Sequence, residues 1–551
     1  MQELLGVGVG RGIAVAKVMR MPEPIAPPSD APLAADLDAE HARVSEALAA
    51  VAADLNARAA AAGGDAQQVL EAAALMAQDP AILDDVRARM SGGANAERAT
   101  WDAYGAFRDM LTAMGGYMAE RATDLEDVAQ RVVARLRGVP APGVPRSDEP
   151  FILVARDLAP ADTATLDLEH TLALVTQDGG PTSHTAILAR SKSLPAVVGV
   201  AGVLAQVADG QLAIVDARAG TVVLDPDAPQ VEAAGAEREA RLAAASAPIT
   251  DGALADGTAV PLLANLGSPN EAAKAVELGA EGVGLFRTEF LFLDASSAPS
   301  VEAQTAAYTE LLEAFPGRKV VVRALDAGAD KPLGFLGDAH EENPALGLRG
   351  IRALRASEQI LRDQLSALVA AQEATEADLW VMAPMIADAE ETEYFVSLGR
   401  ELGLRTVGAM AEVPSIAVVA DQVLEIADFV SIGTNDLTQY TMAADRQLGS
   451  VASFQDPWHP AVLRLVKLLG DAGAATGKPV GVCGEAAADA ALAVVLVGLG
   501  VTTLSMSPSA LADVRAELAT VTLEEARERA ARALTARSAA EARELAAASG
   551  A

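Results

Sequence analysis

The sequence is poor in cysteine, in long apolar runs and in positive charge, and each shortage excludes a class of protein. A single cysteine, Cys483, rules out a disulfide framework and favours a reducing compartment. The most apolar stretch, Ala490–Val501, is well short of the ~20 residues that a membrane-spanning helix needs. The N-terminal residues lack the basic region and apolar run of a signal peptide. We therefore expect a cytoplasmic protein without membrane insertion.

Positive charge is scarce because 42 basic residues face 76 acidic ones, which leaves a net charge of −34. Nucleic acids and anionic membranes require basic surfaces, so neither is an expected partner. An anionic ligand must instead be held by locally clustered arginines. Aromatic residues make up only 3% of the chain, and small aliphatic residues supply much of the 51% that is apolar. This composition favours helices and closely packed α/β layers in a globular protein of about three domains.

The pattern of apolar, glycine and β-branched residues divides the chain into segments with different predicted secondary structure. Residues 1–20 predict a strand, and residues 21–140 carry apolar residues at helical spacing, interrupted by glycine pairs, as in an antiparallel helical bundle. Short β-branched runs over 141–226 predict a compact α/β region. Residues 227–248 predict a charged, alanine-rich linker helix.

The C-terminal part, residues 249–551, contains eight β-like runs separated by helical patterns. Eight alternating β-then-α units are typical of a (β/α)8 barrel. The structural alternative is an open doubly wound sheet, which seldom has eight such evenly alternating units. The runs are Val260–Leu266, Val283–Phe286, Val320–Leu325, Leu379–Ile386, Thr406–Glu412, Phe429–Thr434, Pro479–Gly484 and Thr502–Ser507.

Polar side chains stand at the C-terminal ends of these runs, where a barrel places its catalytic groups. Arg287 and Arg323, with Arg446 further along, can clamp a phosphate or a carboxylate. Glu412 and Asp436 offer the hard oxygen ligands that Mg²⁺ prefers beside substrate phosphate and water. The sequence therefore predicts a phosphorylated small molecule held on Mg²⁺. The alternative is that these side chains form structural ion pairs at the barrel rim.

A second candidate site is a run rich in glycine and hydroxyl groups, GGPTSHT over residues 179–185. The glycine pair lets the backbone turn and expose its N–H groups, Thr182, Ser183 and Thr185 add hydroxyls, and a helical pattern follows. Such a helix N-terminus stabilises an anion and disfavours a histidine cation. His184 is therefore predicted to be a neutral nucleophile that becomes phosphorylated. The remaining histidines are predicted to be structural: His41, His170, His340 and His459.

Three long motifs resemble one family. The run GGPTSHTAILARS over residues 179–191 resembles the phosphohistidine signature of the phosphoenolpyruvate-utilising enzymes. Two barrel segments extend the resemblance, GVGLFRTEFLF over 282–292 and IGTNDLTQY over 432–440. The resemblance covers essentially the whole chain and is strongest to the enzyme I family of the bacterial phosphoenolpyruvate:sugar phosphotransferase system.

This resemblance implies a fold and a reaction. A helical domain that docks a phosphocarrier protein, 21–140, would be inserted into a swivelling α/β phosphohistidine domain made of 1–20 and 141–226. The barrel would bind phosphoenolpyruvate and Mg²⁺ and form a homodimer. The phosphoryl group would pass to Nε2 of His184 with release of pyruvate, and then to a histidine of the phosphocarrier protein that drives sugar uptake.

The same resemblance assigns roles to single residues. Glu412 and Asp436 would ligate Mg²⁺, Cys483 would protonate the enolate, and Thr163 would hydrogen-bond the active histidine. Pro181 stands where many family members carry arginine, which predicts an altered stabilisation of the phosphohistidine. Six residues would hold the substrate: Arg287, Arg323, Arg349, Asn435, Asp436 and Arg446.

The alternative function is that of a pyruvate-phosphate dikinase or phosphoenolpyruvate synthase, since these enzymes share both motifs. They require an additional ATP-grasp domain, whereas the helical block of this chain contains no nucleotide-binding loop. A nitrogen-related paralogue would carry an extra N-terminal sensory domain, for which the start at Met1 leaves no room. A regulatory relic without catalysis would be expected to lose His184 or Glu412, and both are present.

Overall fold

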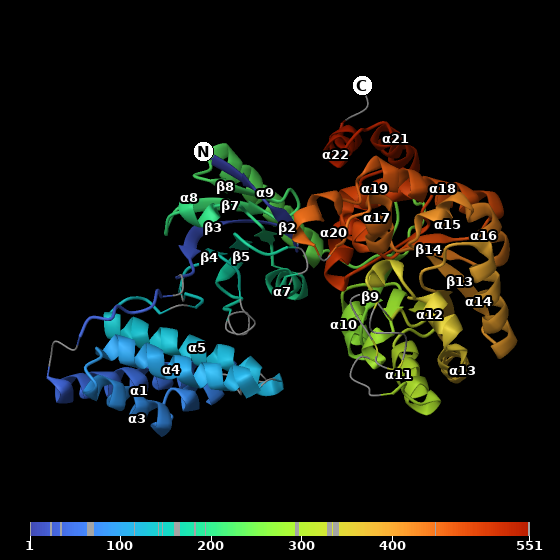
Figure 1. The fold of residues 1–551 in the computed structure, drawn as a ribbon. Helices are drawn as coiled ribbons and strands as arrows, with labels where there is room; N and C mark the ends of the chain where they lie inside the picture. The colour runs from blue at the N-terminus through green and yellow to red at the C-terminus, as the bar shows by residue number, and fades with distance from the viewer. Residues whose placement is uncertain are drawn as a thin grey trace. The chain divides into compact units, whose positions relative to one another are not determined.

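The structure is a computed structural model. It describes residues 2–10, 12–22, 25–32, 36–62, 71–114, 116–141, 143–145, 147–158, 166–180, 183–192, 194–292, 297–327, 333, 335, 341–446 and 448–548. The chain divides into two compact units, Met1–Glu239 and Ala240–Ala551 (Figure 1). Within the described ranges, none of the helices combines the length and the apolar character that a membrane span requires.

The first unit contains an eight-stranded sheet in the order β1-β8-β7-β3-β4-β5-β6-β2. β3 pairs in parallel with β4, in the register Lys17↔Phe151, across the whole helical block of the sequence. The N-terminal strand and the segment after the helical block therefore belong to one sheet. The strands are β1 (Gln2–Leu5), β2 (Val7–Val9), β3 (Ile13–Arg20), β4 (Phe151–Ala155), β5 (Thr171–Thr176), β6 (Ala196–Val198), β7 (Leu212–Asp216) and β8 (Thr221–Leu224).

β4 shows why this sheet is covered on both faces. All five of its residues are buried, as in a strand that has apolar layers above and below it. Because successive side chains point to opposite faces, Ile152 and Val154 enter one apolar cluster while Phe151 and Leu153 enter another. The helices associated with the sheet are α7 (His184–Lys192), α8 (Val203–Gln206) and α9 (Ala228–Ser246).

The helical block packs around its own apolar core. Val44, Val86 and Val128 lie on three different helices and are all at most 1% exposed. α3 begins where the sequence predicts a break, because Asp79 caps it by accepting a hydrogen bond from the Ala81 N–H and Pro80 occupies its first turn. Residues 71–76 are also helical. The other helices are α1 (Leu37–Ala62), α3 (Pro80–Ser91), α4 (Ala96–Met114) and α5 (Gly116–Arg137).

The second unit contains a closed barrel of eight parallel strands, which confirms the expected fold class. Its closure is the pairing of β16 with β9, in the register Leu504↔Leu262. The strands are β9 (Leu262–Leu266), β10 (Val283–Arg287), β11 (Lys319–Arg323), β12 (Asp378–Ala383), β13 (Thr406–Ala411), β14 (Val430–Ile432), β15 (Val480–Val482) and β16 (Thr503–Met506).

Helices surround these strands in Figure 1, as expected for a barrel. The α-helices are α10 (Ala272–Glu277), α11 (Val301–Glu313), α12 (Ile351–Ala356), α13 (Glu358–Ala374), α14 (Ala389–Leu402), α15 (Pro414–Val418), α16 (Ala420–Ile426), α17 (Thr434–Met442), α18 (Pro460–Thr476), α19 (Ala490–Gly498), α20 (Leu511–Leu518), α21 (Leu523–Ala533) and α22 (Ala539–Ala547). Short 3-10 segments are η1 (Pro269–Glu271), η2 (Glu289–Leu291), η3 (Pro344–Leu346), η4 (Gly449–Phe454), η5 (Glu485–Ala488) and η6 (Pro508–Ala510).

The barrel has two apolar cores, and strand alternation separates them. On β11, Val320 and Val322 belong to the large core between strands and helices. Val321 belongs to a small inner cluster with Leu285, Met382, Met410, Phe429 and Cys483. Side chains two positions apart on a strand share a face, so Lys319 and Arg323 lie on the inner side with Val321. β11 thus carries one cation at the base of the barrel and another at its mouth.

Candidate active site

Two arginines stand side by side at the mouth of the barrel. Arg287 ends β10 and Arg323 ends β11, and the two residues are paired in register. Arg323 is only 7% exposed, and its guanidinium contacts Glu289 at 2.5 Å and Asp326 at 3.2 Å. Arg287 is half-buried and forms no ion pair with any residue that the structure describes. Of these two guanidinium groups, that of Arg323 is ion-paired, whereas that of Arg287 has no ion pair among the described residues.

Arg349 reaches the same mouth from the segment before α12. Its Nη2 lies 2.9 Å from Asp326, and its Nη1 lies 3.1 Å from both Asp436 and the Tyr440 hydroxyl. Gly350 follows it with a φ of +58°, and a Cβ there would lie 2.6 Å from the Cβ of Met385. Only glycine can make this close left-handed turn. The turn therefore delivers a buried arginine that no barrel strand carries.

Asp436 joins two of the predicted substrate arginines. It lies in the first turn of α17, is 5% exposed, and accepts Arg349 on Oδ1 and Arg446 on Oδ2, the latter at 3.2 Å. Its neighbour Asn435 accepts a hydrogen bond from the Glu485 N–H at 3.1 Å. The barrel thus brings together all six predicted substrate residues. Three of these arginines, Arg323, Arg349 and Arg446, are ion-paired. Such pairs are expected both for a substrate site and for structural ion pairs at the barrel rim, so a different residue has to distinguish the two interpretations.

The burial of Glu412 is the observation that structural ion pairs at the barrel rim do not explain. It follows β13, is fully buried, and one carboxylate oxygen accepts the Met385 N–H at 2.7 Å. The other oxygen has no hydrogen-bond partner among the described residues. Burial, followed by the charges of Asp436 and Asp326, raises the pKa of Glu412 to about 8. A buried, unpaired carboxylate next to other carboxylates is costly, and a bound cation would relieve that cost.

The surroundings of Glu412 and Asp436 therefore suit a magnesium ion. Within the described ranges, no three acidic, histidine or cysteine side chains form a complete metal cage. Mg²⁺ does not need one, because it usually takes one or two carboxylates and completes its shell with water and substrate phosphate. Met385, which holds Glu412, has the strained φ of +56° that a closely constrained site can retain.

Cys483 lies deeper, directly after β15. It is 1% exposed, belongs to the inner cluster of the barrel, and donates its thiol hydrogen to the Ile432 carbonyl at 3.5 Å. Burial raises the pKa of the thiol to about 11. A thiol of this kind stays protonated at neutral pH, so it is suited to donate a proton and not to attack as a thiolate.

In the first unit, α7 begins at His184 as the sequence predicts. Ser183 accepts the Ala186 N–H on its hydroxyl, which caps the helix, and Gly179 turns with a φ of +92°. Thr185 is fully buried and donates its hydroxyl to Asp157 at 3.0 Å, so this hydroxyl already has a partner within the unit. Thr163, Pro181, Thr182 and the side chain of His184 lie outside the described residues.

Two of the other histidines have partners that a structural role requires, and for the rest that role stays a prediction. His170 pairs with Asp167 at 2.7 Å, and His459 caps α18 by accepting the Ala461 N–H. His340 lies outside the described residues. Tyr440 was not predicted as a site residue. Its position four residues after Asp436 on α17 places both on one helix face, which is the signal that could have identified it.

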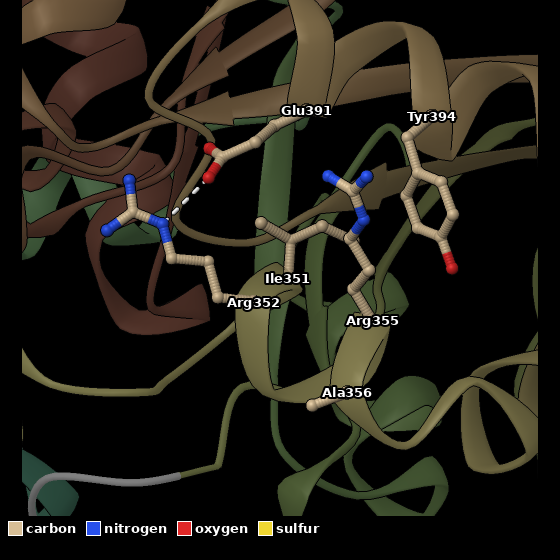
Figure 2. A pocket seen from close by; sticks show the side chains of 6 residues that line it. All are labelled: Ile351, Arg352, Arg355, Ala356, Glu391 and Tyr394. Carbon is tan, nitrogen blue, oxygen red and sulfur yellow. Dashed lines mark hydrogen bonds and ion pairs between the residues drawn. The ribbon is translucent and has the colours of Figure 1, made fainter.

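A separate surface cavity of about 300 Å³ lies between α12 and α14 (Figure 2). Arg352 is bound there to Glu391 at 2.7 Å, and Arg355 lies 4.9 Å from the centroid of the Tyr394 ring. The cavity is lined by Ile351, Arg352, Arg355, Ala356, Glu391 and Tyr394, none of which is a predicted site residue. Its charges are largely satisfied by one another, so the candidate active site stays at the strand ends.

Family profiles of the phosphoenolpyruvate-utilising enzymes match three consecutive parts of the chain. The N-terminal domain of these enzymes matches residues 5–121, their mobile domain matches 147–220, and their phosphoenolpyruvate-binding domain matches 242–523. The last match contains the whole barrel mouth, and the mobile-domain match contains the start of α7.

Relatives match over nearly the full length. A phosphoenolpyruvate-protein phosphotransferase of Streptomyces coelicolor is 54% identical over 98% of both chains, and one of Bacillus subtilis is 39% identical over 96% of both. A solution structure of an Enzyme I protein aligns with 43% of this chain and 98% of its own, at 31% identity and a TM-score of 0.37. With the full-length relatives and the three profiles in agreement, the chain belongs to the family of phosphoenolpyruvate-utilising enzymes that contains the phosphoenolpyruvate-protein phosphotransferases.

Proposed function

We propose that this chain is a phosphoenolpyruvate-protein phosphotransferase. It transfers the phosphoryl group of phosphoenolpyruvate to its own His184, releases pyruvate, and passes the group to a histidine of a phosphocarrier protein that drives sugar uptake. The observation that carries the proposal is the barrel mouth, where several arginines gather near Glu412, a buried carboxylate with one oxygen that has no hydrogen-bond partner among the described residues. Family membership and the names of the full-length relatives support it.

The arginines bind and orient the substrate. Arg287 has no ion pair with a described residue and can meet an anion. Nε of both Arg323 and Arg349 also lacks an acceptor among the described residues. Arg446 is 30% exposed on its side chain and can turn from Asp436 to a phosphate. Phosphoryl transfer needs charge neutralisation and in-line positioning more than covalent help, and a set of guanidinium groups provides both. Asn435 and Asp436 border the same space.

Glu412 and Asp436 would hold Mg²⁺. When bound, the ion supplies positive charge to the phosphate oxygens during transfer. The fold positions the Glu412 carboxylate for this role by burying it and by holding one of its oxygens with a hydrogen bond from the Met385 N–H.

His184 accepts the phosphoryl group, and Cys483 protonates the enolate that is left. A histidine nitrogen forms a bond to phosphorus as the bond from phosphorus to the enol oxygen breaks. The Cys483 thiol then gives its proton to C3 of the enolate, so a C–H bond forms, the S–H bond breaks and a thiolate is left. Direct transfer requires the start of α7 to approach the barrel mouth during turnover. Thr163 remains the predicted hydrogen-bond partner of His184.

The partners follow from charge and exposed surface. A chain with a net charge of −34 favours a carrier protein with a basic docking face. A homodimer through the barrel is supported by exposed apolar side chains on that unit, including Leu346 at 74% and Val418 at 71%. A cytoplasmic location is supported by the reduced state that its free, buried Cys483 implies.

The test of this function is labelling with phosphoenolpyruvate that carries ³²P, in the presence of Mg²⁺. The wild type and His170→Ala, which changes a histidine elsewhere in the same unit, should become labelled, and His184→Ala should not. Label that persists in His184→Ala would disprove the assignment of the nucleophile. Added phosphocarrier protein should discharge the label. Discharge by AMP with pyrophosphate would instead support the dikinase alternative.

A further inference from the structure

The lower half of the barrel interior contains a small polar cavity. It offers about 10 Å³ to water centres, which is roughly enough for one water molecule. Its polar lining comes from Lys319, Ser431, Thr503 and Ser505. Barrels of this kind normally fill that space with bulky branched side chains. A polar cavity at this depth therefore calls for an explanation.

Glycines keep the space between these hydroxyls open. A Cβ at Gly284 would lie 2.4 Å from the Ser505 hydroxyl oxygen. A Cβ at Gly481 would lie 2.6 Å from the Thr503 hydroxyl oxygen and 3.9 Å from that of Ser431. Any larger residue at either position would collide with the polar lining.

The upper end of the cavity is lined by Ser431 and by Val482, which directly precedes Cys483. Ser431, which is 5% exposed on β14, lies close enough to the sulfur for its hydroxyl to lower the pKa of the Cys483 thiol. Cys483 itself is 1% exposed, so water in the barrel mouth has little access to the sulfur. After the proposed reaction the sulfur is a thiolate that must regain a proton. The Ser431 hydroxyl, which lines the cavity and acts on the thiol, is a polar group able to pass one to it from within the barrel.

The lower end of the cavity leads to Lys319. Its ammonium group lies 3.5 Å from the ring centroid of Trp380 and 5.8 Å from that of Phe429, an arrangement that stabilises the cation. Trp380 is held in turn by donating to Asp378 at 2.8 Å. Lys319 is only half-buried, so its ammonium group can exchange protons with solvent at the barrel base.

The acidities of the two ends favour transfer from the base to the sulfur. Burial lowers the pKa of Lys319 to about 8, against the charge of Asp378. Burial raises the pKa of Cys483 to about 11; Glu412 adds to this, while Ser431, Arg323 and Arg287 act against it. A proton therefore moves downhill from the ammonium to the thiolate.

We propose that Lys319, a water in the cavity and Ser431 form a relay that returns a proton to Cys483 after each turnover. The proposal rests on the proposed function, because only protonation of the enolate produces the thiolate. The Ser431 hydroxyl gives its proton to sulfur and takes one from the water, which takes one from the ammonium of Lys319. The resulting amine regains a proton from solvent, and no oxidation or reduction occurs.

Two isotope exchanges separate this relay from the reaction itself. Both are measured on the full chain with phosphoenolpyruvate, pyruvate and Mg²⁺ in D₂O. Exchange of ¹⁴C between pyruvate and phosphoenolpyruvate can reuse the same proton on Cys483 indefinitely. Entry of deuterium into the methyl group of pyruvate requires a hydron from solvent. The ratio of deuterium entry to carbon exchange therefore reports the relay alone.

The relay predicts a specific pattern in the variants. Lys319→Met and Ser431→Ala should keep carbon exchange within about threefold of wild type, while the ratio falls about tenfold or more, within the range of general acid–base effects. Lys319→Arg, which keeps the charge but cannot readily give up a proton, should show the same fall. Ser431→Thr retains the hydroxyl and should recover most of the ratio. Lys467→Met, at an exposed lysine paired with Asp471, is the matched control and should behave as wild type.

The pH profile adds a readout that a structural role would not move. The wild-type ratio should fall above about pH 8, where Lys319 loses its proton, and Lys319→Met should lack that fall. A wild-type ratio in Lys319→Met, Lys319→Arg and Ser431→Ala would overturn the relay. Absence of carbon exchange in the wild type would overturn the proposed function instead.

Discussion

The barrel mouth and the start of α7 prepare for an anion in different ways. The mouth uses full charges that are buried and paired, as Arg323, Arg349 and Asp436 show. The start of α7 uses the backbone turn at Gly179 and the Ser183 cap, with no acidic residue in its first turn. Full charges in a buried network suit a trianionic substrate. Neutral donors suit a group that must be received and then released to a partner.

The largest expected effect comes from breaking the buried network. Arg323→Met removes the guanidinium and leaves Glu289 buried without that cation, while Asp326 keeps Arg349. Such an uncompensated charge costs about 3–5 kcal/mol of unfolding free energy. Urea unfolding followed by circular dichroism measures the loss.

Arg446→Met is the matched control for that prediction. Its partner Asp436 keeps Arg349, and the Arg446 side chain is 30% exposed, so the cost should stay below about 1 kcal/mol. Equal losses in the two variants would show that the mouth is not the tightly coupled network that we describe.

The second effect concerns Cys483, the single cysteine. With burial raising its pKa to about 11, only about one thiol in ten thousand is ionised at pH 7. A disulfide reagent such as Ellman's should therefore modify the native chain at least about 100-fold more slowly than the urea-unfolded chain. Because the pKa is raised, the native rate should climb as the pH increases towards 11. A fast, pH-independent reaction at pH 7 would contradict the buried thiol.

The third effect isolates binding from stability within the mouth. Arg287 has no ion pair with a described residue, so Arg287→Met should barely change the urea midpoint. It should still lower kcat/KM for phosphoenolpyruvate by about 10- to 100-fold, the value of one hydrogen bond to a charged group. Arg287→Lys should recover part of the loss. A destabilisation as large as that of Arg323→Met would show that Arg287 serves the fold.

The smallest effect tests the start of α7. Thr185→Val keeps the shape of the side chain but removes the hydrogen bond to Asp157, which should cost about 1 kcal/mol in the unfolding of the first unit. Labelling of His184 should persist, because this hydroxyl is already engaged by Asp157. Thr112→Val, at an exposed hydroxyl on α4, is the control and should be neutral. Loss of labelling in Thr185→Val would show that the Thr185 hydroxyl contributes directly to the phosphorylation of His184, as the sequence predicts.

Local patterns predicted the elements and much of the site. The eight β-like runs became the eight barrel strands because strand ends depend on nearby turns and on apolar spacing. His184 at a helix start followed from the glycine pair and the helical pattern beside it. The strand ends predicted Arg287, Arg323 and Glu412 in one mouth, since parallel strands finish at the same edge.

Local patterns could not predict contacts between side chains that are far apart in the sequence. Arg349 and Asp436 meet across 87 positions of sequence, and only the left-handed turn at Gly350 makes that meeting possible. The Thr185 hydroxyl donates to Asp157 on another segment, and no local pattern predicts that contact. The proximity of Lys319 to Trp380 and Phe429 depends on barrel closure in the same way.

The sequence by itself determined the architecture, the family and the types of group at the site, because short motifs and apolar periodicity are local properties of the chain. The tertiary structure alone decided which groups are buried and which are paired. That distinction sets their chemistry. Closure of the barrel shields Cys483 and Glu412 from water and Lys319 in part, and this desolvation moves all three pKa values towards the neutral forms. Burial is a property of the whole fold, so no stretch of sequence records it.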